Sequence, residues 1–145
     1  MDIVTTRFGT VTIEPSDVLT FVDGLIGMED CRRWALLADA QNPALGWLQC
    51  LDRSEVALAV VGPRRFVSDY CVRVSRRDVE PLECDCPDDA QVLVIVNQVN
   101  ESLVVNLKAP LVIHVAKRLG RQIVAKDEHS VQHPISGGLE LRRTG

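Results

Sequence analysis

The chain has 145 residues, 46% of them hydrophobic and 25% charged, which suits a single domain with a real apolar core. Its net charge of −4, from 16 basic and 20 acidic side chains, makes it a poor candidate for non-specific nucleic-acid binding. No apolar run approaches the roughly 18 residues of a membrane-spanning helix, and the N-terminus lacks the basic start and apolar run of a signal peptide.

Short strand-like runs follow one another along the chain. There are 21 valines and only 4% aromatic residues, a bias that favours strands over helices. The expected strands are residues 3–7, 11–13, 18–22, 34–37, 46–51, 56–61, 70–74, 91–96, 103–105, 111–115 and 122–125. Gly120 lies between the last two runs, where it predicts a hairpin turn. Turns recur about every 8–12 residues, a spacing typical of an antiparallel sandwich or small barrel.

Helices are expected to be few and short. The best candidate is residues 78–83, with Asp78 as its cap and Pro81 limiting its length. A parallel α/β fold would need a helix of roughly 10 residues or more between strands, and none is visible. The sequence therefore predicts an all-β, antiparallel, barrel-like single domain over residues 1–135, followed by a flexible tail over 136–145.

The cysteines and histidines do not form a convincing metal or catalytic site. The five cysteines are odd in number and scattered, which favours a reducing cytoplasm. Cys84 and Cys86 are closer together than the usual Cys-x2–4-Cys zinc pair, and Pro134 disfavours a helix that would bring His129 and His133 onto one face. Cys50 and Cys71 lie in strand-like runs and are predicted to be small core residues. The sequence therefore predicts no bound metal.

Sequence signatures of enzymes are also missing. There is no Gly-x-Ser-x-Gly elbow around a serine nucleophile and no glycine-rich phosphate loop. We therefore expect neither enzymatic activity nor a cofactor.

Charged residues are segregated along one stretch of the chain. Residues 78–89 contain six acids and no base, whereas the arginines Arg64, Arg65, Arg73, Arg76 and Arg77 lie just upstream. One interpretation is a solvated loop beside a solvated basic face. The other is an acidic patch that steers a basic partner. The basic cluster lacks interleaved aromatics for base stacking, which argues against a direct RNA role.

The segment 104–113, with sequence VVNLKAPLVI, contains two β-branched strand runs around a polar loop. Pro110 cannot donate to a ladder, so it belongs at a strand start. The segment resembles the VNLxAPLVIN box of the flagellar assembly factor family (FliW). Four further segments resemble motifs of that family in the same order. They are TTRFG at 5–9, TFVDGLIGME at 20–29, WLQ at 47–49 and PRRFVSDY at 63–70, and GRQ at 120–122 follows the box.

This resemblance implies a cytoplasmic protein with a β-barrel-like fold and two partners. We also expect the protein to be monomeric or weakly associating. One partner is flagellin, bound before export. The other is the carbon storage regulator CsrA, a basic RNA-binding dimer whose repression of flagellin synthesis the released factor relieves. An acidic patch near that regulator would repel RNA without blocking its groove. The main alternative is a small β-barrel that binds a metabolite or nucleotide at its mouth.

Several polar residues of these motifs are candidates for partner contact. They are Asp69, Tyr70, Asn106, Lys108 and Gln122, to which the acidic run adds Asp85, Asp88 and Asp89 for the regulator. The other interpretation is that these side chains form hydrogen bonds with backbone groups in loops. Phe21 and Trp47 are predicted to be core residues, and Gly24 to serve a turn.

Overall fold

A computed structural model describes residues 1–84 and 89–135. Its strands are β1 (Asp2–Thr5), β2 (Gly9–Thr12), β3 (Val18–Phe21), β4 (Arg33–Ala38), β5 (Leu45–Cys50), β6 (Ala57–Val61), β7 (Ala90–Val99), β8 (Ser102–Val105), β9 (Leu111–His114), β10 (Leu119–Gln122) and β11 (His133–Pro134). The helices of the described residues are short: α1 (Arg76–Val79) and the 3-10 turns η1 (Pro15–Asp17), η2 (Pro63–Arg65) and η3 (Glu80–Leu82). The prediction of an all-β domain with at most short helices is confirmed.

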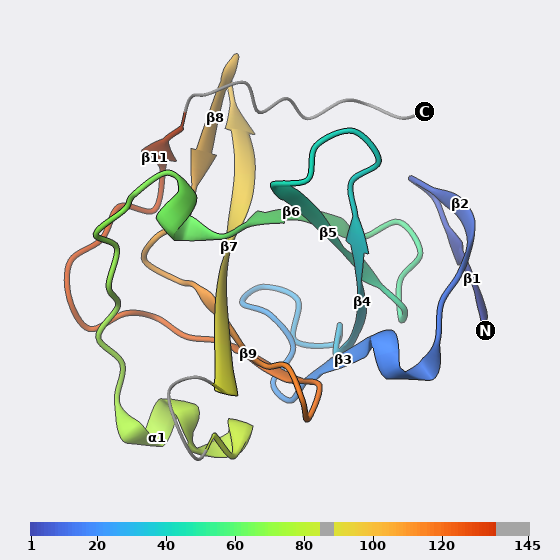
Figure 1. Ribbon diagram of the computed structural model, residues 1–145, viewed down its shortest axis with the longest axis horizontal. Coiled ribbons are helices and arrows are strands. Elements are labelled where there is room, and N and C mark those ends of the chain that lie inside the picture. The colour runs from blue at the N-terminus through green and yellow to red at the C-terminus, as the bar shows by residue number, and fades with distance from the viewer. Residues whose placement is uncertain (85–88, 136–145) are drawn as a thin grey trace.

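Seven strands close into a barrel in the order β3-β4-β5-β6-β7-β9-β10 (Figure 1). Closure depends on the length of β7, whose first half pairs with β9 over Ala90–Leu93 and whose second half pairs with β8 over Val96–Val99. The β7–β8 hairpin therefore projects beyond the barrel, where β11 extends it. The pairing is antiparallel except between β3 and β10, which run parallel. The separate β1–β2 hairpin packs beside the barrel.

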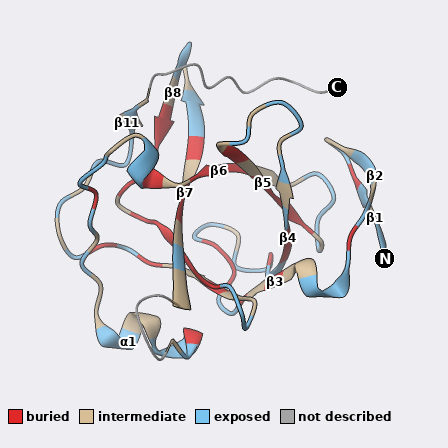
Figure 2. Cartoon of the chain, viewed as in Figure 1, coloured by how far each residue is buried: buried red, intermediate tan, exposed pale blue. Residues whose placement is uncertain are grey.

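The interior of the barrel is filled by large side chains from its strands. Phe21, Trp34 and Leu48 are at most 1% exposed, and the Phe21 and Trp34 rings meet edge to face with centroids 6.4 Å apart. Buried residues follow the barrel strands in Figure 2. Successive strand residues face opposite sides of a sheet, so the same strands also bury a second set of side chains outside the barrel.

Two outer clusters cover the outside of the sheet. The first surrounds Trp47, with Phe8 of the first hairpin packed against the indole at 5.7 Å between ring centroids. The second surrounds Val112 and Ile123 and is covered by Leu82 of η3. The buried state expected for Phe21 and Trp47 is confirmed, at 0% and 5% exposure.

Some expected elements differ from the structure. Residues 70–74 do not form a strand, because their backbone groups bond singly to side chains and to the segment around Asp127 instead of to a neighbouring strand. Cys71 is consequently exposed and is not the core residue predicted. The helix α1 is capped by Ser75, with Asp78 three residues later completing a capping box, so Asp78 is not the cap.

Gly120 is not in a hairpin turn. The turn between β9 and β10 spans residues 115–118, and Arg118 takes its left-handed position with φ of 56°. Gly120 lies inside β10 opposite Phe21. A Cβ at Gly120 would lie 2.7 Å from the Phe21 ring. Glycine is therefore needed here because the Phe21 ring lies so close to the backbone of β10, and not because the position requires a turn conformation.

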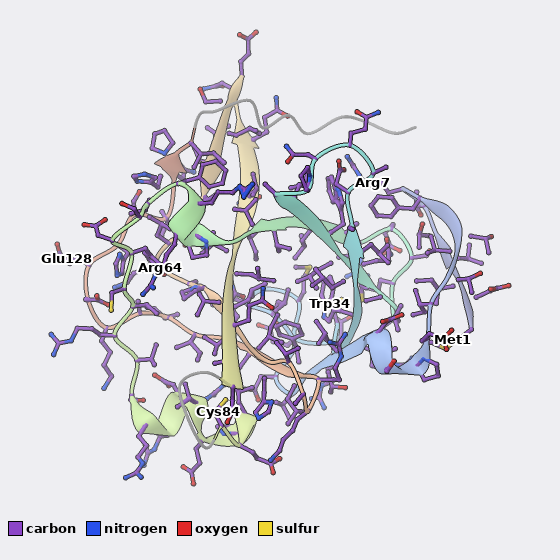
Figure 3. All side chains as sticks on the ribbon, in the orientation of Figure 1. Met1, Arg7, Trp34, Arg64, Cys84 and Glu128 are labelled. Atoms are coloured by element: carbon purple, nitrogen blue, oxygen red, sulfur yellow. The ribbon has the colours of Figure 1, made fainter. Side chains whose placement is uncertain are left out.

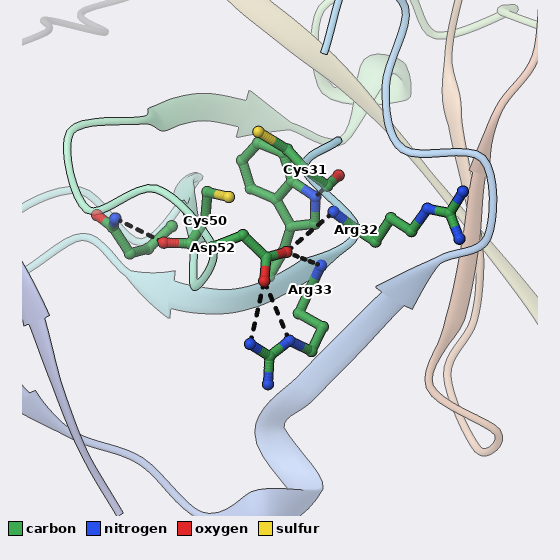
Figure 4. Close-up of polar contacts among 7 residues, drawn as sticks. Cys31, Arg32, Arg33, Cys50 and Asp52 are labelled. Atoms are coloured by element: carbon green, nitrogen blue, oxygen red, sulfur yellow. Dashed lines mark hydrogen bonds and ion pairs between the residues drawn. The ribbon is translucent and has the colours of Figure 1, made fainter. Parts of the chain in front are cut away.

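A charged clamp fixes the start of β4 (Figure 4). The Asp52 carboxylate accepts hydrogen bonds from the backbone amides of Arg32 and Arg33, at 3.2 and 3.0 Å, and from the Arg33 guanidinium at 3.0 and 3.2 Å. The hydrogen bond from the Arg33 amide is the main cause of the lowered pKa of Asp52. Hydrogen bonds to a charged acceptor are stronger than those between neutral groups, so the bonds to Asp52 stabilise the start of β4.

We expect Asp52→Asn to lower the free energy of unfolding by about 1 kcal/mol at pH 6. The pKa of Asp52 is lower in the folded protein than in the unfolded chain. Its contribution is therefore present above the unfolded value, near 3.9, and is lost as the pH falls through the folded value. Urea unfolding at pH 6 and pH 3 should show a difference between variant and wild type that is smaller at pH 3.

Glu55→Gln provides the matched control for this substitution. It removes a carboxylate from the exposed pair with Arg53, whose N–O distance is also 3.0 Å, and we expect no measurable change in stability. A difference between Asp52→Asn and wild type that persists unchanged at pH 3 would show that the effect does not come from the charge.

Candidate partner-binding site

The loop between β8 and β9 is built around Asn106. The Asn106 Oδ1 atom accepts hydrogen bonds from the amides of Lys108 and Ala109, each at 3.1 Å. Such a side-chain turn fixes the local backbone without a ladder partner. Pro110 ends the loop directly before β9, as expected for a proline at a strand start.

Residues 123–130 run beside this loop and complete its hydrogen bonding. The Ala125 amide donates to the Lys108 carbonyl at 2.7 Å, and the Leu107 amide donates to the Ser130 carbonyl at 2.9 Å. The Lys108 ammonium donates to the Asp127 carbonyl at 2.8 Å. Hydrogen bonds of both backbone and side-chain groups therefore fix the conformation of the loop.

Tyr70 joins a second motif segment to the loop. Its side chain is buried, and its hydroxyl donates to the Leu107 carbonyl at 2.7 Å. Burial, with a smaller effect from the Asp127 charge, raises the pKa of Tyr70 to about 12. The phenol is therefore protonated at neutral pH and able to donate this bond.

His129 covers the Tyr70 ring, with ring centroids 4.9 Å apart. The His129 Nε2 atom lies 3.0 Å from Asp127 Oδ2 and 3.1 Å from the Cys71 carbonyl. Both neighbours are acceptors, so Nε2 carries a hydrogen. The pKa of Asp127 is lowered mainly by the hydrogen bond from the Arg73 amide. These contacts join residues 70–73 to residues 127–129.

The histidine and aspartate do not form a catalytic arrangement with a nucleophile. His129 contacts the carbonyl of Cys71 and not its sulfur, and nucleophile activation needs a base within hydrogen-bond reach of the thiol. Cys31 is buried, and that burial raises its pKa to about 11, so little thiolate is present at neutral pH. Across residues 1–84 and 89–135, no three His, Cys, Asp or Glu side chains are grouped to hold a metal ion.

Gln122 connects the loop to a turn near the start of the chain. Its Oε1 atom accepts from the Ile26 amide at 2.9 Å, and its Nε2 atom donates to the Ala109 carbonyl at 3.1 Å. The turn itself needs Gly24, whose φ is +66° and whose Cβ would lie 2.6 Å from the Glu29 carbonyl oxygen. The turn expected at Gly24 is confirmed.

The predicted contact residues thus fall into different groups. Tyr70, Asn106, Lys108 and Gln122 come together around the β8–β9 loop, and all four bond to backbone atoms. Asp69 is exposed beside them. Asp89 precedes β7, and its Oδ2 atom lies 4.0 Å from His114 Nε2. Asp85 and Asp88 lie outside the described residues.

The acidic run is not simply a solvated loop, since its first residues belong to α1 and η3. Hydrogen bonds to Ser75 lower the pKa of Asp78, and Glu83 pairs with Lys117 at 3.3 Å. No local pattern indicates the roles of Asp127 and His129, because their partners Arg73 and Cys71 are 54 and 58 residues away.

The described contacts fix the conformation of the β8–β9 loop and of the segments beside it. Figure 3 places Arg64 and Glu128 on the same side of the molecule, away from Met1 and Arg7. This side carries both cationic and anionic groups close to a fixed loop. Within the part of the chain that the structure describes, no helix is long and apolar enough to cross a membrane.

Comparisons with known proteins give a consistent result. Residues 2–135 match the family model described as "FliW protein". The flagellar assembly factor FliW of Bdellovibrio bacteriovorus is 34% identical over 145 residues, which cover 98% of this chain and 83% of that protein. The FliW of Syntrophus aciditrophicus is 38% identical over 130 residues, covering 88% and 82%. A crystal structure of the flagellar assembly factor FliW has the same fold, with a TM-score of 0.85 at 22% identity, covering 96% of this chain and 100% of that one.

Proposed function

Because the chain belongs to the FliW family of flagellar assembly factors, we propose that it binds flagellin in the cytoplasm and, once released, binds and antagonises the regulator CsrA. The observation that most supports a binding role is the meeting of motif segments far apart in the sequence. Tyr70 of one motif donates to Leu107 of another across 37 positions, and His129 covers the junction. Such a preorganised loop lowers the entropy lost when a partner binds.

We assign the protein no enzymatic activity and no cofactor. The alternative is a metabolite or nucleotide held at the mouth of the barrel. Phe21, Trp34 and Leu48 fill the interior, so such a ligand could not extend into the barrel itself. A protein partner contacts the outer surface, where the barrel strands hold the side chains in fixed positions.

The central test uses purified flagellin and purified CsrA with the full chain. We expect each to form a stoichiometric complex in calorimetry and size-exclusion chromatography. We also expect flagellin to displace CsrA when both are present. Absence of heat and of co-elution with either protein, at concentrations up to about 100 μM, would refute the proposed function.

Asp69 is the best-placed motif residue for a partner contact, because it is exposed and makes no side-chain hydrogen bond or ion pair with the described residues. We expect Asp69→Asn to weaken flagellin binding by about two- to fivefold, since an exposed charge contributes little alone. The melting temperature should not change. Calorimetric titration with flagellin measures the first effect, and a thermal melt measures the second.

Glu101→Gln is the matched control for Asp69→Asn. Glu101 is exposed in the β7–β8 turn, and the substitution removes the same charge elsewhere on the molecule. If both variants weaken flagellin binding equally, the effect is one of net charge and Asp69 is not a specific contact.

The acidic residues before β7 are proposed to act on the regulator. We expect the triple substitution of Asp85, Asp88 and Asp89 with Asn to slow association with CsrA by roughly tenfold at low salt, because charge acts mainly on encounter rate. Flagellin binding should be nearly unchanged. Stopped-flow association at low and high salt measures this. Association as fast as wild type at low salt would show that the acidic run does not steer CsrA.

A further inference from the structure

A cavity of about 750 Å³ lies outside the barrel, between η2, the segment after it and the start of β7. Pro43, Ala44, Val72 and Val92 contribute apolar walls, and Tyr70 lies among the lining residues. The volume is in the range of about 300–1,000 Å³ that is usual for small-molecule sites. Apolar walls with a few convergent polar groups are also typical of such sites.

Two arginines give the cavity a positive charge. Arg64 and Arg65 both line it, and none of its described lining residues is an acid. The Arg64 Nε atom donates to the Tyr70 carbonyl at 3.0 Å, which fixes the guanidinium beside the cavity. Neither arginine forms an ion pair with another described residue. Guanidinium groups remain charged at all physiological pH values, so the cavity attracts anions.

The surrounding chemistry favours one kind of anion. A polyphosphate is usually held by several backbone amides, but the turn beside this cavity begins with Pro63, which has no amide hydrogen. A guanidinium fork matches the paired oxygens of a carboxylate as well as those of a phosphate, so the missing amide hydrogen of Pro63 leaves the carboxylate as the better match. The apolar walls would then bury a hydrocarbon body attached to that carboxylate.

We propose that this cavity binds a small organic carboxylate with an apolar body. Arg65 and the free nitrogens of Arg64 bind the carboxylate, and the walls formed by Val72 and Val92 contact the hydrocarbon chain. The proposal does not rest on the partner proteins proposed above, although Tyr70 both lines the cavity and bonds to the β8–β9 loop. The cavity differs from a ligand site inside the barrel, because it lies on the outer face of β7.

Octanoate is the probe for the first test, with octanamide as its uncharged counterpart. Calorimetry on the full chain should give a dissociation constant on the order of 0.1–1 mM for octanoate, as expected for a ligand of this size. Octanamide should bind at least about tenfold more weakly, because it lacks the charge that the guanidinium groups recognise. Arg65→Gln should weaken octanoate binding by about tenfold or more.

Arg77→Gln is the matched control, since Arg77 is exposed on α1 and does not line the cavity. It removes the same charge and should leave octanoate binding unchanged. Thermal melts of both variants show whether each is folded. Equal weakening by the two substitutions, or equal binding of octanoate and octanamide, would overturn the proposal.

A second measurement uses only the wild-type protein. Cys71 is exposed and lines the cavity, whereas Cys84 does not line it and serves as an internal reference. Octanoate should slow alkylation of Cys71 by iodoacetamide, read by peptide mass mapping, without slowing that of Cys84. No protection and no heat at 10 times the expected dissociation constant would overturn the site. So would binding of an apolar peptide with a free C-terminus when octanoate does not bind, because the occupant would then be a protein chain end.

Discussion

Replacing Gly120 with alanine is expected to lower the free energy of unfolding by about 2–3 kcal/mol. The new Cβ would lie 2.7–3.0 Å from three carbons of the Phe21 ring, closer than atoms in a packed core approach. Phe21 is 0% exposed and packs on Trp34, so the ring can move away from the new methyl group only by displacing other core side chains. At this chain length the loss corresponds to a fall in melting temperature of roughly 6–12 °C. Thermal and urea unfolding would measure both quantities.

Gly62→Ala is the control for this substitution. Gly62 has φ of −72° and no atom within 4 Å of an added Cβ, so we expect stability to change by less than about 0.5 kcal/mol. A double-mutant cycle locates the cause. Phe21→Leu should cost less in the Gly120→Ala background than in wild type, because the smaller side chain makes room for the methyl group. Equal costs in the two backgrounds would show that the clash with Phe21 is not the reason.

The strands with strong apolar patterning could be predicted from the sequence, and those that depend on distant partners could not. The runs that became β5, β6 and β7 are rich in β-branched and apolar residues, which fit a pleated surface wherever they are placed. The run at 70–74 also contains apolar residues at alternate positions, but it lies outside the barrel and pairs with no strand among the described residues. Hydrophobic periodicity indicates which residues share one face of a strand. It does not indicate whether a neighbouring strand is present to pair with it.

The closure of the barrel is another property that local sequence patterns do not predict. The parallel pairing of β3 with β10 joins residues about 100 positions apart and makes Gly120 a packing residue. A glycine between two apolar runs can lie in a turn or inside a tightly packed strand, and the neighbouring sequence looks the same in both cases. The difference depends on Phe21, which only the folded topology brings near.

The motif residues near the candidate site were recognised, but their individual roles were not. Asn106 and Gln122 are polar residues in loops, and the same residue types serve partner contact and backbone capping. In the structure both side chains form hydrogen bonds with backbone groups. Asp69 differs from them because it is exposed and makes no internal bond to the described residues.

The junction between the motifs can be tested through a single hydroxyl group. Tyr70→Phe keeps the ring against His129 but removes the donor to the Leu107 carbonyl, which is then left buried without this bond. We expect the free energy of unfolding at pH 7 to fall by about 1–3 kcal/mol, the cost of an unsatisfied buried polar group. Urea unfolding would measure it. Thr12→Val is the control, because the Thr12 hydroxyl bonds to Asp2 on the exposed surface and its loss should cost less than about 0.5 kcal/mol.

The dependence of this effect on pH gives an independent check. The folded pKa of Tyr70 is raised to about 12, above the usual value near 10, so the folded state holds the phenolic proton more tightly than the unfolded chain does. The stabilisation from this proton is therefore fully present below pH 10 and is lost as the pH rises towards 12. The stability difference between wild type and Tyr70→Phe should shrink over that interval. A difference that stays constant from pH 7 to pH 11, or a variant as stable as wild type at pH 7, would show that the hydroxyl does not secure the loop, and Tyr70 would then contribute through its ring alone.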